Sequence, residues 1–153
     1  MGIVRHIGIA HVSTRRHLLK RASAVLLLDR FSQGRYATDA AFHQMMRLGV
    51  LSPKPEDEIQ AAIDTVRDHN VPLLARGGGT SQCGQTINKA LVLDYSKYFN
   101  EVELDLENQR CIVRPEIVPD ALNHVLKPHG LWCRVDVSTA SRQTIGEMAG
   151  NNS

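Results

Sequence analysis

The spacing of apolar residues predicts a strand, a helix and two further strands in the middle of the chain. Short apolar runs at residues 49–53, 71–75 and 90–94 are typical of buried strands. Residues 55–70 lie between the first two runs, and their apolar side chains share one helix face: Ile59, Ala62, Ile63 and Val66. Strand, helix and strand within about 30 residues indicate a βαβ unit.

The pattern changes after residue 98. Residues 101–115 alternate around a turn at 107–109, which predicts a hairpin. Residues 118–130 then predict a helix, ended by a proline and a glycine, whose apolar face comprises Ala121, Leu122, Val125 and Leu126. A further short helix is expected to begin near residue 144.

These elements predict an α+β fold in three parts. Residues 34–97 form a small α/β subdomain, and residues 98–153 begin a second α+β subdomain that is incomplete. Residues 1–33 form a basic N-terminal extension, since the first 28 residues hold five Arg or Lys residues and no acid. This extension is either a helical or disordered segment or an Arg-rich targeting peptide. No stretch approaches the roughly 18 apolar residues of a membrane span.

Charge and cysteine content narrow the function classes. A formal net charge of +2 is too small to predict nucleic-acid or membrane binding. The three cysteines are an odd number without a CxxC pair, which favours reduced thiols in a cytoplasmic compartment, while organelle targeting by the basic N-terminus stays open.

A glycine-rich stretch, RGGGTSQCGQT at residues 76–86, follows the second predicted strand. Successive N–H groups in a turn without Cβ atoms form a concave site for an anion such as phosphate. The stretch fits neither common phosphate loop. Gln85 replaces the lysine of a Walker A loop, and Gln82 replaces the third glycine of a dinucleotide-binding fingerprint. A tight turn that only happens to be rich in glycine is the alternative.

A second stretch, VDVSTASRQTIGEMAGNNS at residues 135–153, places hydroxyl groups beside the start of a helix. A helix N-terminus presents free N–H groups and is also a candidate anion site. Gly146 and Gly150 stand four residues apart and would allow close packing against a flat ligand. The two stretches, one in each predicted subdomain, could hold a diphosphate between them.

Other residues carry weaker hypotheses. Arg76 and Arg142 either neutralise a diphosphate or are simply exposed. Cys83 has no identifiable base beside it, which favours a small loop residue over a nucleophile. His124, His129 and Cys133 are close in sequence, but no tight cluster of metal ligands is found, and no metal is expected.

The two stretches together resemble the FAD-binding domain of the vanillyl-alcohol oxidase and p-cresol methylhydroxylase (PCMH-type) family. They are most like its D-lactate, glycolate and D-2-hydroxyglutarate dehydrogenase branch. The residues that carry the likeness are RGGGTSQCGQT (76–86), LVLDYSKYFN (91–100), KPHGLW (127–132) and DVSTASRQTIGEMAGNNS (136–153). The likeness extends from about residue 34 to the end and implies a PCMH-type fold, with this chain as an N-terminal fragment.

By this resemblance the first stretch wraps the FAD pyrophosphate through backbone N–H groups, and the second contacts the other side of the cofactor. The implied cofactor-binding residues are Arg76, Gly77, Gly78, Gly79, Thr80, Ser81, Gly84, Gln85, Ser138, Ser141, Thr144, Ile145, Gly146 and Asn151. Gly79 and Thr80 stand where members with a covalent flavin often carry a histidine, so the resemblance implies non-covalent FAD. The implied reaction is hydride transfer from a small 2-hydroxy acid to the flavin. The resemblance identifies neither a catalytic residue nor the electron acceptor.

Two features depart from the family's pattern. Glu147 stands at the second glycine of the usual Thr-Ile-Gly-Gly, where a carboxylate would repel a diphosphate, and we expect its side chain to point outward. The chain also ends at Ser153, before the family's substrate-capping domain and histidine-rich metal motif. The alternatives are therefore a non-catalytic truncated fragment, or an unrelated phosphate-binding module that prefers ATP.

Overall fold

The computed structural model describes residues 25–152, which fall into two compact units. Unit 1 contains the described residues up to Ala75 together with Ser81–Asp94, and unit 2 contains Arg76–Thr80 and the described residues from Tyr95 onward. The glycine-rich stretch is therefore divided between the units. The limits of 34–97 and 98–153 stay a prediction, and the targeting-peptide hypothesis falls mainly on residues 1–24, outside the described part of the chain.

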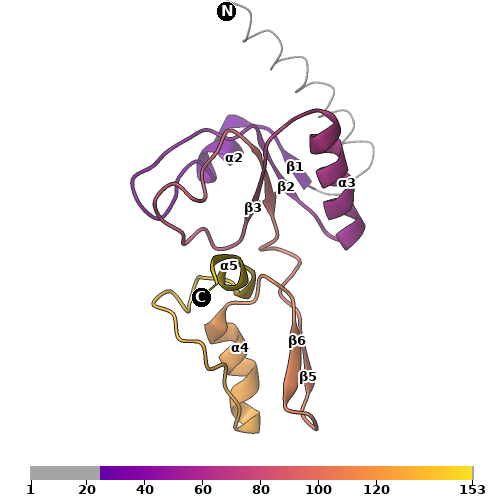
Figure 1. Ribbon diagram of the computed structural model, residues 1–153, viewed down its shortest axis with the longest axis vertical. Helices are drawn as coiled ribbons and strands as arrows, with labels where there is room; N and C mark the ends of the chain where they lie inside the picture. The colour runs from indigo at the N-terminus through magenta and orange to yellow at the C-terminus, as the bar shows by residue number, and fades with distance from the viewer. Residues whose placement is uncertain (1–24, 153) are drawn as a thin grey trace, which may run out of the picture. The chain divides into compact units, whose positions relative to one another are not determined.

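Unit 1 is built on a four-stranded sheet in the order β1-β2-β4-β3. Figure 1 labels β1, β2 and β3 of this sheet. Its strands are β1 (Val25–Leu27), β2 (Gly49–Ser52), β3 (Leu73–Arg76) and β4 (Leu91–Asp94). β2 pairs in parallel with β4 and antiparallel with β1. Every residue of β2 and β4 is buried because these strands are central, whereas the edge strands β1 and β3 are partly exposed. The three predicted strands are confirmed, and β4 lies between the two strands of the expected βαβ unit.

Helix α3 (Glu56–Asp68) confirms the predicted helix between β2 and β3. It begins after Pro55, and its first turn is acidic, which suits the positive end of the helix dipole. Ala62 and Val66 are buried as expected. Ile63 was wrongly placed on the buried face, since its side chain is 37% exposed.

Residues 25–33, which the sequence pattern assigns to the basic extension, form β1 and the first part of helix α2 (Arg30–Arg35). Asp29 caps α2, because its carboxylate accepts a hydrogen bond from the Ser32 N–H at 2.9 Å. This segment extends the sheet of unit 1 by one antiparallel strand.

Unit 2 combines the predicted hairpin with two helices. The hairpin is β5 (Val102–Asp105) and β6 (Arg110–Val113), and the helices are α4 (Pro119–Leu126) and α5 (Ile145–Asn151). A 3₁₀ turn, Lys127–His129, follows α4.

The core of unit 2 lies between α4 and one face of the hairpin. Leu122 and Leu126 of α4 are buried with Ile117, and the inward side chains of both strands pack against them. The predicted face of α4 was wrong at one position, since the Val125 side chain is 37% exposed. Gly130 ends this region in the left-handed conformation, as expected for a glycine after a helix.

Candidate functional site

The first three glycines of the glycine-rich stretch lie in unit 2, where they run close to the second predicted stretch. A Cβ atom on Gly77 would lie 2.5 Å from the Thr144 Oγ1. A Cβ on Gly78 would collide with the main-chain oxygen of Arg142. The structure therefore brings the two stretches together, and glycine is required at position 78 because its backbone passes against that of Arg142. Packing of the chain on itself thus explains these glycines, a reason that the sequence pattern, which offered a ligand or a tight turn, did not include.

Gly79 adopts a left-handed conformation with φ of +70°, which a residue with a side chain rarely takes. The Arg76 guanidinium lies over this residue, 2.5 Å from where a Cβ would stand. Arg76 therefore folds back on the loop, and this position is compatible with the predicted role in neutralising a diphosphate.

The Glu147 side chain contradicts the expectation that it points outward. Its Oε1 accepts a hydrogen bond of 2.7 Å from the Gly79 N–H, and its Oε2 accepts one of 3.2 Å from the Thr144 N–H. The Glu147 N–H in turn donates to the Thr144 Oγ1 at 3.3 Å, which completes a capping box at the start of α5. The sequence Thr-x-x-Glu is the signature of this motif, so the inward direction could have been read from the chain.

The second stretch is held by turns and by backbone contacts within unit 2. The Arg142 and Gln143 N–H groups both donate to the Thr139 carbonyl, at 2.8 and 2.7 Å. The Gly146 N–H donates to the Pro115 carbonyl at 2.7 Å, and a Cβ on Gly146 would lie 2.8 Å from the Pro115 Cβ. Gly146 is thus bare because it packs on its own chain, whereas a Cβ on Gly150 would meet nothing within 4 Å.

Exposure differs among the predicted residues of the second stretch. Thr144 is buried as the helix cap, and Ile145 and Gly146 are partly buried. Ser138, Ser141 and Asn151 are exposed. Their cofactor-binding roles stay a prediction.

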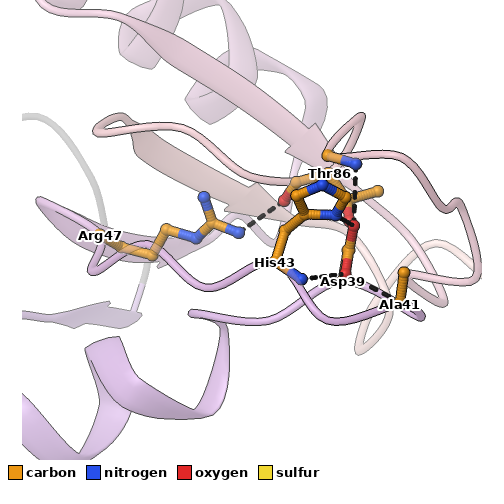
Figure 2. Close-up of polar contacts among 6 residues, drawn as sticks. Asp39, Ala41, His43, Arg47 and Thr86 are labelled. Carbon is orange, nitrogen blue, oxygen red and sulfur yellow. Dashed lines mark hydrogen bonds and ion pairs between the residues drawn. The ribbon is translucent and has the colours of Figure 1, made fainter.

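Ser81, Gly84 and Gln85 belong to unit 1, and the segment around Asp39 contacts the first two of them. Figure 2 shows Asp39 with His43 and Ala41 in this segment. The Asp39 carboxylate accepts hydrogen bonds from the Gly84 N–H at 2.8 Å and from the His43 ring at 2.9 Å. The Ala40 N–H donates to the Ser81 carbonyl at 3.3 Å. Gly84 is left-handed, with φ of +76°, so Asp39 fixes a backbone turn that few residues would adopt unaided.

Burial of Asp39 opposes its ionisation, but hydrogen bonds outweigh this cost. The donors are the Gly84 and Ala41 N–H groups and the His43 side chain, and they hold the pKa of the Asp39 carboxyl below its ordinary 3.8. The side chain is fully buried, at 0% exposure. Asp39 therefore stays ionised near neutral pH and keeps its donors in place.

We expect the Asp39→Asn variant to change how stability depends on pH. Because the folded pKa is depressed, the carboxylate stabilises unit 1 above its ordinary pKa, and this contribution is lost as the pH falls through the folded pKa. The free energy of unfolding should thus fall more steeply below about pH 4 in the wild type than in Asp39→Asn. Urea denaturation at stepped pH measures this. Glu103→Gln, an exposed change on β5, should keep the wild-type slope, and equal slopes for all three proteins would contradict the assignment.

Arg47 anchors the other side of the same loop and carries no signal in the sequence. Its side chain is buried, at 2% exposure, and its nitrogens donate to the carbonyl oxygens of Tyr36, Asn88 and Thr86 at 2.6, 2.8 and 2.5 Å. Figure 2 shows the guanidinium of Arg47 reaching the Thr86 carbonyl. Asn88 and Thr86 lie 41 and 39 residues from Arg47 in the sequence, so no local pattern could indicate these two contacts.

Two further observations concern metal binding and membrane-spanning helices. Within residues 25–152, no group of three or more His, Cys, Asp or Glu side chains is placed to hold a metal ion. The helices described in that range are all too short or too polar to cross a membrane.

The chain is similar to known proteins both in sequence and in fold. Residues 48–153 match the family described as an FAD binding domain. D-2-hydroxyglutarate dehydrogenase of Pseudomonas putida is 35% identical over 117 residues, covering 73% of this chain and 12% of that protein. The GlcD subunit of glycolate oxidase from Bacillus subtilis is 33% identical over 122 residues, covering 77% of this chain and 26% of that subunit. The solved structure of p-cresol methylhydroxylase with substrate bound has a TM-score of 0.66 at 15% identity, over 96% of this chain and 29% of that one.

These comparisons confirm the predicted fold and cofactor. The likeness to p-cresol methylhydroxylase, at 15% identity, shows the fold alone, which is the expected PCMH-type α+β architecture. The chain spans only 12% to 26% of the length of the two sequence relatives. The family match includes both the glycine-rich stretch and the second stretch. The chain therefore belongs to the FAD binding domain family, whose cofactor is FAD.

Proposed function

We propose that the chain is the FAD-binding part of a flavin-dependent oxidoreductase that oxidises a small 2-hydroxy acid, of the D-2-hydroxyglutarate, D-lactate or glycolate type. The substrate class is supported by the similarity to D-2-hydroxyglutarate dehydrogenase and to the glycolate oxidase subunit. The observation that carries the cofactor role is the close approach of Gly77 and Gly78 to the second stretch in unit 2.

Two backbone N–H groups of this loop, those of Gly77 and Gly78, are suitable donors to a diphosphate. Across the described part of the chain, no hydrogen-bond acceptor is found for the N–H groups of Gly77 and Gly78. A glycine N–H without a Cβ beside it is a suitable donor to a phosphate oxygen. The Gly79 N–H differs, because Glu147 already uses it. Bound FAD supplies the hydride acceptor, and this chain's residues bind and orient its diphosphate.

We further propose that the FAD is held non-covalently, because Gly79 and Thr80 stand where a linking histidine would be expected. The three cysteines are free thiols, which supports a reducing compartment such as the cytoplasm. The rival functions are a non-catalytic piece and a phosphate-binding module of another kind. Preference for ATP over FAD would favour the latter.

The oxidation of a 2-hydroxy acid is tested with the protein that contains this chain, loaded with FAD. Under anaerobic conditions, at least one of D-2-hydroxyglutarate, D-lactate and glycolate should bleach the flavin absorbance near 450 nm, on the order of the full oxidised signal, because the flavin takes up the hydride. If none of the three acids lowers the flavin absorbance of a protein that retains FAD, the proposed substrate class is overturned.

A further inference from the structure

A carboxylate lies inside the glycine loop that is proposed to receive a diphosphate. Glu147 places Oε1 2.7 Å from the Gly79 nitrogen and Oε2 3.3 Å from where a Cβ of Gly78 would stand. Both oxygens therefore face the loop. The Glu116 carboxylate is also close, with Oε2 3.0 Å from where a Cβ of Gly77 would stand. The carboxylates of Glu147 and Glu116 and the guanidinium of Arg76 therefore all lie beside the glycines of this loop.

The contact between Glu147 and Gly79 uses the type of donor that a phosphate needs. An N–H group that donates to a carboxylate makes a charge-assisted hydrogen bond, about twice as strong as one between neutral groups. A phosphate oxygen is an anionic acceptor of the same kind. One N–H cannot serve both acceptors with good geometry, and two anions held side by side repel each other.

We propose that Glu147 is an internal anion that occupies the Gly79 N–H and must leave it when a diphosphate is bound. Glu147 then sets how tightly the loop holds the cofactor, and it keeps the loop in shape when no cofactor is present. This inference rests on the proposed role of the loop in FAD binding. It gives Glu147 a second task besides capping α5.

Glutamine is the informative replacement at this position. A capping box accepts either Glu or Gln as its fourth residue, so Glu147→Gln keeps the cap of α5 and the size of the side chain. It removes the negative charge and replaces one of the two acceptor oxygens by an NH2 donor, so the single oxygen that remains can serve the Thr144 N–H or the Gly79 N–H but not both. Glu103→Gln makes the same chemical change on the exposed face of β5 and serves as the matched control.

We expect Glu147→Gln to bind FAD at least about tenfold more tightly than the wild type, since a competing charge-assisted contact is weakened. Isothermal titration calorimetry measures the Kd for FAD, and for inorganic pyrophosphate as a probe of the diphosphate alone. Glu103→Gln should keep the wild-type Kd for both. The melting temperature of each variant, without ligand, shows whether the fold is intact.

The contact itself is tested in the cofactor-free protein. The Gly79 amide signal of a ¹⁵N-glycine-labelled sample should shift in Glu147→Gln and stay unchanged in Glu103→Gln. If wild type binds FAD and Glu147→Gln binds it no more tightly, the proposal is overturned while the cofactor role of the loop stands. If neither protein binds FAD or pyrophosphate, both proposals fail.

Discussion

Replacing Gly78 with alanine is expected to destabilise unit 2 and to abolish FAD binding. The new Cβ would collide with the main-chain oxygen of Arg142, which cannot move aside as a flexible side chain could. Forcing an extra methyl group into such a contact costs roughly 1–3 kcal/mol of unfolding free energy, and the two stretches must separate to relieve it. Chemical denaturation followed by circular dichroism measures the first effect, and an FAD titration measures the second.

Gly150→Ala is the matched control for this change. It lies on α5, and a Cβ there would meet nothing within 4 Å. Because alanine favours a helix by up to about 1 kcal/mol over glycine, this variant should be at least as stable as the wild type. If Gly78→Ala proved as stable as Gly150→Ala and bound FAD equally well, the close packing of the two stretches would be refuted.

Arg47→Met is expected to have the largest effect on the stability of unit 1. Methionine keeps much of the length of the side chain but leaves three carbonyl oxygens without their donor. Each buried group left unsatisfied costs about 1–3 kcal/mol, so the loss should reach roughly 3 kcal/mol or more. Urea denaturation followed by circular dichroism checks this value.

Arg67→Met tests whether the loss is specific to the buried guanidinium. Arg67 lies on α3 with a 69% exposed side chain, and its ion pair with Asp64 is at the surface. Exposed ion pairs contribute roughly 0–1 kcal/mol, so this change should be nearly neutral. Similar losses for Arg47→Met and Arg67→Met would show that the three carbonyl contacts of Arg47 do not stabilise the fold.

Periodicity was sufficient to predict most of the fold. Strands β2 and β4 are short apolar runs, GVLS and LVLD, and these are the strands buried along their whole length. The hairpin of unit 2 was also predicted, because its side chains alternate between the core and the solvent. β1 was missed because only three residues form it, and its pairing with β2 depends on contacts that local pattern does not contain.

The sequence predicted part of the candidate site. The physical reasons why the rest was missed differ between residues. The resemblance placed the two stretches on the cofactor, and the structure brings Gly78 and Arg142 into contact within unit 2. The direction of Glu147 was wrong because charge repulsion with a ligand was weighed, whereas the local capping box decides it. Asp39 and Arg47 were missed because the contacts that tie them to residues 84–88 join segments some 40 residues apart in the sequence.

The most direct test of the cofactor site is an FAD titration of the ¹⁵N-glycine-labelled chain, with ATP as the competing ligand. The amide signals of Gly77 and Gly78 should shift and saturate with FAD, while that of Gly130, at the end of α4, should stay in place. ATP should produce a weaker effect. Saturable FAD binding that leaves Gly77 and Gly78 unchanged, or equal binding of ATP, would contradict the proposal that these glycines hold the FAD diphosphate.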